Sequence, residues 1–144
     1  MSSSIGNMDP YVYPGTNILK NLRNIRDPDR LDEFEAEATS RRLFQLALRP
    51  LPGGFDTKHL QAIHHHIFKD VYSWAGELRT VDIAKSGDLF ALPQFVMPSL
   101  QTAFEELRKE NHLQSADEVR FAHRGAYYLS ELNAIHPFGD GKRV

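Results

Sequence analysis

Cysteine is absent from the 144 residues of this sequence. Its absence excludes disulfides and thiolate metal sites, and it is compatible with a cytoplasmic protein. No uninterrupted run of about 18 apolar residues occurs, so the sequence predicts no membrane-spanning helix. The N-terminal residues also lack the basic and apolar regions of a signal peptide. We therefore expect a cytoplasmic protein without a membrane partner.

An excess of charge of one sign is missing too. The formal net charge is −2, which provides no basic field for nucleic acid, so direct nucleic-acid binding is not expected. Hydrophobic residues make up 41% of the sequence and charged residues 25%, as in ordinary globular proteins. No internal repeat divides the chain, and its length predicts a single domain over residues 1–144.

Most of the sequence carries the periodicity of amphipathic helices. The expected helix starts are Asp, Ser, Thr or Asn residues, which favour N-caps, and the expected ends lie near Pro and Gly. In the last expected helix, one face is formed by Val119, Ala122, Ala126, Leu129 and Asn133. The predicted helices are a short one from Thr16 or Asn17 to Ile25, one from Asp27-Pro28 to before Pro50, one from Asp56 or Thr57 through Val71, one from Gln94 to about Asn111, and one from a capping box at Ser115–Glu118 to Ile135.

From Leu78 the apolar period changes to two, and a turn sequence follows at residues 85–88 before Leu89. This pattern predicts one β-hairpin within a helical protein. A lone hairpin is marginal in water unless it packs on something. The hairpin could be a structural flap over the core, or an edge strand that pairs with a bound target segment.

Three consecutive histidines, His64, His65 and His66, lie in the predicted helix that begins near Thr57. Neighbouring helical residues point about 100° apart, so the three rings cannot converge on one metal. None of the three has another histidine at i+4, the spacing of a helical zinc pair. We expect some of these rings to pack between helices instead.

The last ten residues combine the groups that phosphate chemistry needs. Histidine can accept a proton near neutral pH, and carboxylate oxygens suit Mg²⁺. Glycines allow backbone N–H groups to face an anion, and cations neutralise phosphate charge. An exposed turn is the simpler explanation of the same residues. The residues concerned are His136, Gly139, Asp140, Gly141, Lys142 and Arg143.

At these positions the sequence resembles the Fic family. Residues 136–143, HPFGDGKR, resemble the family signature HPFx(D/E)GN(G/K)R. Residues 72–81, YSWAGELRTV, resemble the WAGE-x-R segment that leads into the family's flap hairpin. Residues 11–25, YVYPGTNILKNLRNI, resemble the N-terminal segment of bacterial Fic toxins. The three motifs occur in the family's order, and the likeness extends from about Asp9 to the end of the sequence.

The resemblance implies a mainly α Fic fold, a helical core with one β-hairpin flap. It also implies a protein adenylyltransferase toxin, which transfers AMP from ATP to a hydroxyl side chain of a target protein. In that mechanism His136 is the catalytic base, and Asp140 binds the Mg²⁺ that bridges the α- and β-phosphates. The implied nucleotide-binding residues are Gly139, Gly141, Lys142 and Arg143, and the implied target-docking residues of the flap are Thr80, Val81, Asp82 and Ile83.

The sequence departs from the family signature in its phosphate-binding half. The Asn before the Lys is absent, and the sequence ends at Val144, before a second Arg. We therefore expect a Fic domain truncated just after its active-site motif, and a poor or inactive transferase in this 144-residue form. The alternatives are a catalytically impaired partner-binding module, or a Fic enzyme that transfers phosphate or another nucleotide moiety.

Many Fic proteins are inhibited by a helix that carries (S/T)xxxE(G/N). Residues 73–77 and 102–106 match only S/T-xxx-E, and Leu follows each. The resemblance at residues 11–25 therefore predicts control by a small, separately encoded antitoxin that carries the motif. The rival expectation is an inhibitory helix beyond Val144. For this toxin subgroup the resemblance also implies type II topoisomerases as targets.

Overall fold

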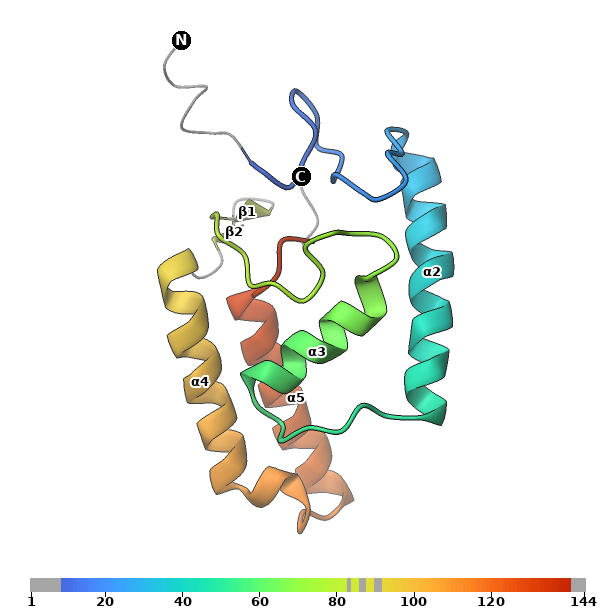
Figure 1. Cartoon of the computed structure of the whole chain (residues 1–144). Helices are drawn as coiled ribbons and strands as arrows, with labels where there is room; N and C mark the ends of the chain where they lie inside the picture. The colour runs from blue at the N-terminus through green and yellow to red at the C-terminus, as the bar shows by residue number, and fades with distance from the viewer. Residues whose placement is uncertain (1–8, 83, 86–87, 90–91, 141–144) are drawn as a thin grey trace.

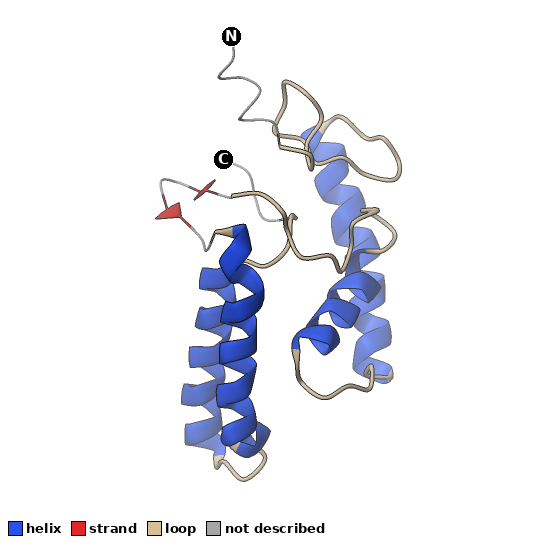
Figure 2. Cartoon of the chain, turned by 60° about the vertical axis from the view of Figure 1, so that its left-hand side comes forward, coloured by secondary structure: helices blue, strands red, loops and turns tan. Residues whose placement is uncertain are grey.

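The computed structural model describes residues 9–82, 84–85, 88–89 and 92–140. The fold is mainly α, as predicted. Figures 1 and 2 show α4 and α5 side by side, and α3 lies between this pair and α2. Within the described residues no helix is long and apolar enough to cross a membrane. The elements are α2 (Pro28–Leu48), α3 (Thr57–Phe68), β1 (Ala84–Lys85), β2 (Asp88–Leu89), α4 (Pro93–Lys109), the 3₁₀ turn η1 (Asn111–Leu113) and α5 (Glu118–Ile135).

Three of the helices begin at an aspartate. The side chains of Asp27, Asp56 and Asp117 each accept a hydrogen bond from a backbone N–H of the first turn. Such caps satisfy donors that have no partner within the helix. The caps of α2 and α3 confirm the sequence prediction. The predicted capping box of α5 is wrong by two residues, because Asp117 occupies the cap in place of Ser115.

The short helix predicted from Thr16 or Asn17 to Ile25 does not form. Residues 12 and 19 form an isolated antiparallel bridge instead, and the side chain of Asn21 bonds to the backbone of Leu19 and Ile25. Asn24 has a φ of 54°, in the left-handed region that a right-handed helix cannot include. The Asn21 side chain therefore competes successfully with helical hydrogen bonds.

Buried side chains form two clusters. One joins α2 to the segment after α3 through Leu31, Ala38, Val71 and Tyr72. The other joins α4 to the end of α5 through Val96, Leu100 and Ile135. The α3 prediction was too long, because α3 ends at Phe68 and Val71 lies in the loop that follows.

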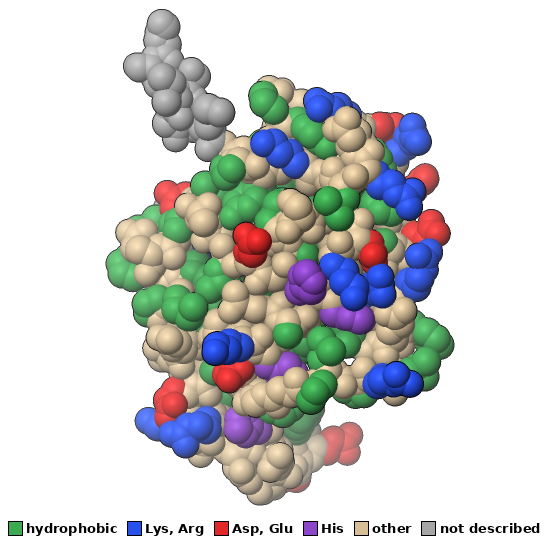
Figure 3. Space-filling view, in the orientation of Figure 1, with side chains coloured by type: hydrophobic (Ala, Val, Ile, Leu, Met, Phe, Trp, Pro, Cys, Tyr) green, Lys and Arg blue, Asp and Glu red, His purple; other side chains and the backbone are tan. Residues whose placement is uncertain are grey.

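The face of α5 that the sequence pattern identified is its exposed face. Val119 is 67% exposed and Leu129 is 70% exposed, whereas Tyr128 and Ile135 are buried. This helix carries apolar residues on two sides, and periodicity alone does not say which side meets α4. Figure 3 shows acidic and basic side chains interspersed among the described residues of one face of the molecule.

The predicted hairpin is described only in part. β1 and β2 are antiparallel, with Ala84 opposite Leu89 and Lys85 opposite Asp88. Residues 83, 86–87 and 90–91 lie outside the described residues. The strand pattern expected from Leu78 onward is not continuous, because Leu78 forms an isolated bridge with Phe138. That bridge brings the segment after α3 against the residues that follow α5.

Candidate active site

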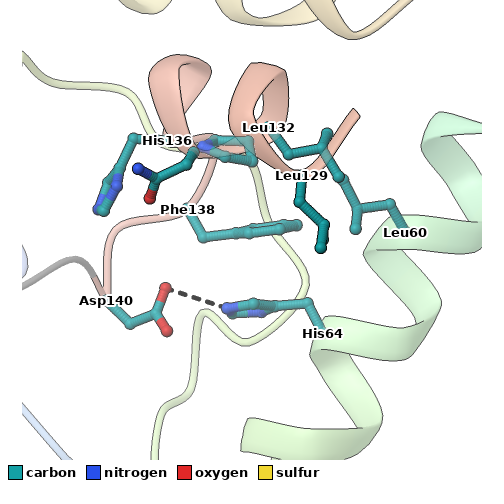
Figure 4. Close-up of a pocket in the computed structure, with 9 residues that line it drawn as sticks. Leu60, His64, Leu129, Leu132, His136, Phe138 and Asp140 are labelled. Carbon is teal, nitrogen blue, oxygen red and sulfur yellow. Dashed lines mark hydrogen bonds and ion pairs between the residues drawn. The ribbon is translucent and has the colours of Figure 1, made fainter. Parts of the chain in front are cut away.

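The chain turns sharply where α5 ends. His136 adopts a left-handed conformation with φ 49° and ψ 67°, and its N–H donates to the carbonyl of Leu132 at 2.9 Å. Pro137 follows and cannot continue the helix. The turn opens a cavity of about 440 Å³, shown in Figure 4. The cavity is lined by Leu60, His64, Leu129, Leu132, Asn133, His136, Pro137, Phe138 and Asp140.

A buried arginine fixes this turn from behind. Arg79 is only 3% exposed, and its guanidinium donates from Nε to the carbonyl of His136 at 2.6 Å and from Nη2 to that of Ile135 at 3.0 Å. Its Nη1 donates to the carbonyl of Val81 at 2.7 Å, and its backbone N–H donates to Pro137 at 2.8 Å. The last carbonyls of a helix have no partner within the helix and carry partial negative charge. Arg79 therefore holds the backbone of His136 in its left-handed conformation.

Phe138 anchors the loop after α5. Its side chain is buried, and its ring stacks on that of His64 with centroids 3.7 Å apart. On α3, the His64 ring also stacks on Phe68 with centroids 4.6 Å apart. Figure 4 shows the Phe138 ring lying over the His64 ring beside the cavity. The loop is therefore held against α3 by aromatic stacking.

The carboxylate of Asp140 lies beside the same histidine. Nε2 of His64 is 3.0 Å from Oδ1 of Asp140, and Nδ1 of His64 accepts a hydrogen bond from the N–H of Gly76 at 2.9 Å. Gly76 has a φ of 87°, and a Cβ there would lie 2.8 Å from the carbonyl oxygen of Gln61, so a side chain would be strained and crowded. The segment that carries Arg79 therefore also supports Asp140 through His64.

The N-terminal segment packs on the site as well. Tyr11 is buried, its ring makes an edge contact with Trp74 at 5.0 Å, and its hydroxyl accepts from the N–H of Thr80 at 3.0 Å. A Cβ on Gly139 would lie 2.7 Å from Cε1 of Tyr11. The close approach of this ring explains the glycine at position 139. Residues 11–25 are thus in direct contact with the loop that follows α5.

The structure brings two of the predicted site residues to one cavity, His136 and Asp140. Among the predicted docking residues, Thr80 bonds to Tyr11, the Val81 carbonyl bonds to Arg79, and Asp82 is exposed. The other predicted site residues, Ile83, Gly141, Lys142 and Arg143, lie outside the described residues.

Asp140 suits Mg²⁺, which needs few protein ligands, better than it suits a metal ion whose ligands are all protein side chains. The described residues contain no cluster of three or more His, Asp or Glu side chains that could hold a metal ion. Mg²⁺ commonly takes one or two protein carboxylates and completes its shell with substrate phosphates and water. A single carboxylate on the wall of a cavity matches that pattern.

Sequence reasoning missed three residues that support the site: His64, Arg79 and Tyr11. One signal was available for His64, because it lies at i+4 from Leu60 and so shares its face of α3. Arg79 could have been noticed as the one arginine inside the WAGE-x-R segment. Nothing in the sequence places Tyr11 against Gly139, because the contact joins the two ends of the described chain.

A model of the Fic/DOC family matches residues 54–143. The chain belongs to this family. It is 39% identical over 136 residues to protein adenylyltransferase VbhT of Bartonella schoenbuchensis, a match that covers 94% of this chain and 28% of VbhT. It is 35% identical to the probable protein adenylyltransferase Fic of Escherichia coli, a match that covers 98% of this chain and 70% of that protein.

Solved structures share the fold. The N-terminal Fic domain of a Bartonella quintana effector, crystallised with bound ADP, superposes with a TM-score of 0.84 at 28% identity. The superposition covers 92% of this chain and 69% of that one. The chain thus spans less than a third of VbhT and about two thirds of the other two proteins. The Fic fold expected from the sequence motifs is confirmed.

Proposed function

We propose that the protein carrying this chain transfers AMP from ATP to a hydroxyl side chain of another protein. The observation that carries the proposal is the pair His136 and Asp140, which line one cavity at the end of α5. The names of its relatives support the reaction class, since two of them are described as protein adenylyltransferases. The ADP bound to the Bartonella quintana domain supports a nucleotide as the substrate.

His136 would act as the general base. The target hydroxyl gives its proton to the imidazole while its oxygen forms a bond to the α-phosphorus of ATP. The bond from the α-phosphorus to the oxygen that bridges to the β-phosphate breaks, and pyrophosphate leaves. His136 then releases the proton to solvent. Such chemistry depends mainly on positioning and on charge stabilisation.

The remaining residues would hold the nucleotide. Asp140 would bind Mg²⁺, which neutralises charge on the α- and β-phosphates when bound. Gly139 and Gly141 would present backbone N–H groups to phosphate, and Lys142 and Arg143 would add positive charge. These assignments follow the family signature.

The target segment would dock on the flap at Thr80, Val81, Asp82 and Ile83. The antiparallel pair β1 and β2 follows this segment directly, and an extended peptide can add a strand to an exposed edge. Backbone pairing of this kind would hold the target hydroxyl in a fixed position along the strand.

We also propose that the protein is a bacterial toxin of the cytoplasm, restrained by a separate antitoxin that carries (S/T)xxxE(G/N). The N-terminal segment that resembles the toxins packs on Gly139 through Tyr11, so a partner docked there lies close to the site. Type II topoisomerases are the proposed targets. Co-expression tests the restraint: the toxin should be tolerated only with its antitoxin, and harmlessness of the toxin alone would contradict it.

The reaction itself is tested with ATP labelled at the α- or the γ-phosphorus. The protein is incubated with each label, Mg²⁺ and a bacterial lysate, and labelled proteins are separated on a gel. AMP transfer predicts a protein band labelled from the α-position alone. A band labelled from the γ-position alone would indicate phosphate transfer instead. No band from either label would favour the partner-binding module.

A further inference from the structure

We propose that His64 is a positioning residue for this reaction, and that it fixes the Asp140 carboxylate in the orientation that binds Mg²⁺. The inference rests on the proposed function, because it concerns the metal site of that reaction. His64 belongs to the triplet that the sequence showed unable to converge on one metal. It acts here through Asp140.

The hydrogen bonds of His64 define which ring nitrogen carries the proton. The backbone N–H of Gly76 can only donate, so Nδ1 of His64, at 2.9 Å, must accept and is unprotonated. The proton of the neutral ring therefore lies on Nε2, which donates to Oδ1 of Asp140 at 3.0 Å. The backbone of one segment thus selects the tautomer that can hold the carboxylate.

A neutral donor suits a metal ligand better than a cation would. A lysine or arginine in the place of His64 would neutralise the carboxylate and compete with Mg²⁺ for it. The neutral imidazole orients Asp140 and leaves its negative charge in place. In the described part of the chain, Oδ1 is the oxygen of Asp140 that accepts a hydrogen bond, and Oδ2 has no donor. Partners behind a ligand commonly orient it in this way.

The ring of His64 is itself held firmly. It is 7% exposed and lies between the rings of Phe138 and Phe68. Gly76, which bonds to Nδ1, cannot move away from α3 without losing its own close packing on Gln61. Positions held by packing on both sides give the precision that a binding site needs. His64 therefore holds the carboxylate of Asp140, which lies on a loop, in a fixed position relative to α3.

Two substitutions separate the two hydrogen bonds of His64. In His64→Gln the amide nitrogen lies about as far along the side chain as Nε2, so the donor to Asp140 is kept. In His64→Asn the amide oxygen lies near the place of Nδ1, so the acceptor for Gly76 is kept and the contact with Asp140 is lost. His65→Asn is the control, because His65 is the next residue of α3 and its Nδ1 contacts the carbonyl of Ala75 at 3.0 Å, away from Asp140.

The measurement is Mn²⁺ binding, followed by electron paramagnetic resonance in the presence of a non-hydrolysable ATP analogue. Thermal melting and the Mg²⁺ dependence of AMP transfer are recorded for the same variants. We expect His64→Asn to weaken Mn²⁺ binding about 10–100-fold. His64→Gln and His65→Asn should stay within about threefold of wild type on the same scale. The Mg²⁺ concentration that gives half-maximal transfer should move in parallel.

Wild-type Mn²⁺ affinity in His64→Asn would overturn the inference. Equal losses of Mn²⁺ affinity in His64→Asn and His64→Gln, in proportion to their losses of melting temperature, would also overturn it. That result would indicate a purely structural role for His64. Asp140→Asn separates this failure from failure of the metal site. If Asp140→Asn loses Mn²⁺ and His64→Asn does not, only the role of His64 is wrong. If Asp140→Asn binds Mn²⁺ like wild type, the proposed metal site fails and the inference fails with it.

Discussion

Substitution of Arg79 is the sharpest test of how the site is held together. Among the described residues, Arg79→Ala removes the guanidinium hydrogen bonds to the carbonyls of Ile135, His136 and Val81, at 3.0, 2.6 and 2.7 Å. The carbonyls of Ile135 and His136 lie at the C-terminal end of α5, where no backbone N–H replaces the lost donor. We expect the substitution to lower the stability of the fold and to displace His136.

The magnitude follows from the number and kind of bonds. Hydrogen bonds to charged groups contribute about 1.5–3 kcal/mol each, but burying the guanidinium costs several kcal/mol in the wild type. We therefore expect a net loss of about 3–5 kcal/mol for Arg79→Ala. At about 2–4 °C per kcal/mol for a protein near this size, the melting temperature should fall by about 6–20 °C. A displaced base should also slow AMP transfer by about 10²-fold.

Thermal denaturation and the rate of AMP transfer below the melting temperature are the assays. Arg79→Lys should regain part of the stability, because one ammonium keeps the charge but not the planar fork. Arg108→Ala is the matched control, since Arg108 pairs with Glu105 on the exposed surface of α4, where ion pairs contribute little. If Arg79→Ala had the melting temperature and the transfer rate of the Arg108→Ala control, the role of Arg79 in holding the turn after α5 would be refuted.

Two further predictions concern packing and pH. Gly139→Ala should lower the melting temperature, because its Cβ would lie 2.7 Å from the Tyr11 ring. The double variant with Tyr11→Ala should lose less stability than the two single variants lose together, because Tyr11→Ala removes the ring that the new Cβ meets. Strict additivity of the two losses would contradict the contact. The hydrogen bond from Arg124, with that from Tyr128, lowers the pKa of Glu110 from 4.5 to about 2, so the unfolded chain binds the proton first as the pH falls. The free energy of unfolding, measured by chemical denaturation, should therefore fall as the pH drops from about 4.5 to 2. Glu110→Gln should show a smaller fall over the same pH range. An equal fall in the variant and the wild type would contradict the link to Glu110.

The sequence predicted best what depends on local interactions. Asp27 and Asp56 cap their helices because a cap needs only the next three residues, and Pro137 ends α5 for an equally local reason. The motif after α5 predicted that His136 and Asp140 lie in one site, and the two residues line one cavity. Which neighbouring residues come together at the end of a helix can therefore be predicted from their order.

What the sequence did not predict depends on distant contacts. His64 and Asp140 lie 76 residues apart, and Arg79 lies 57 residues from the carbonyl of His136. The exposed side of α5, with Leu129, has the same helical periodicity as its buried side, so only the packing of α4 tells them apart. Periodicity indicates an element and its possible faces, whereas tertiary contacts decide which residues support the site.

The role of His136 as the general base is tested by the rate of AMP transfer by His136→Ala. Label from α-labelled ATP should disappear from the target, because loss of a general base slows transfer by about 10²–10⁴-fold. Nucleotide binding and the melting temperature should stay close to those of the wild type, because Arg79 binds the backbone carbonyl of His136, which the substitution leaves in place. A His136→Ala variant that labels its target at close to the wild-type rate would contradict the assignment of the base.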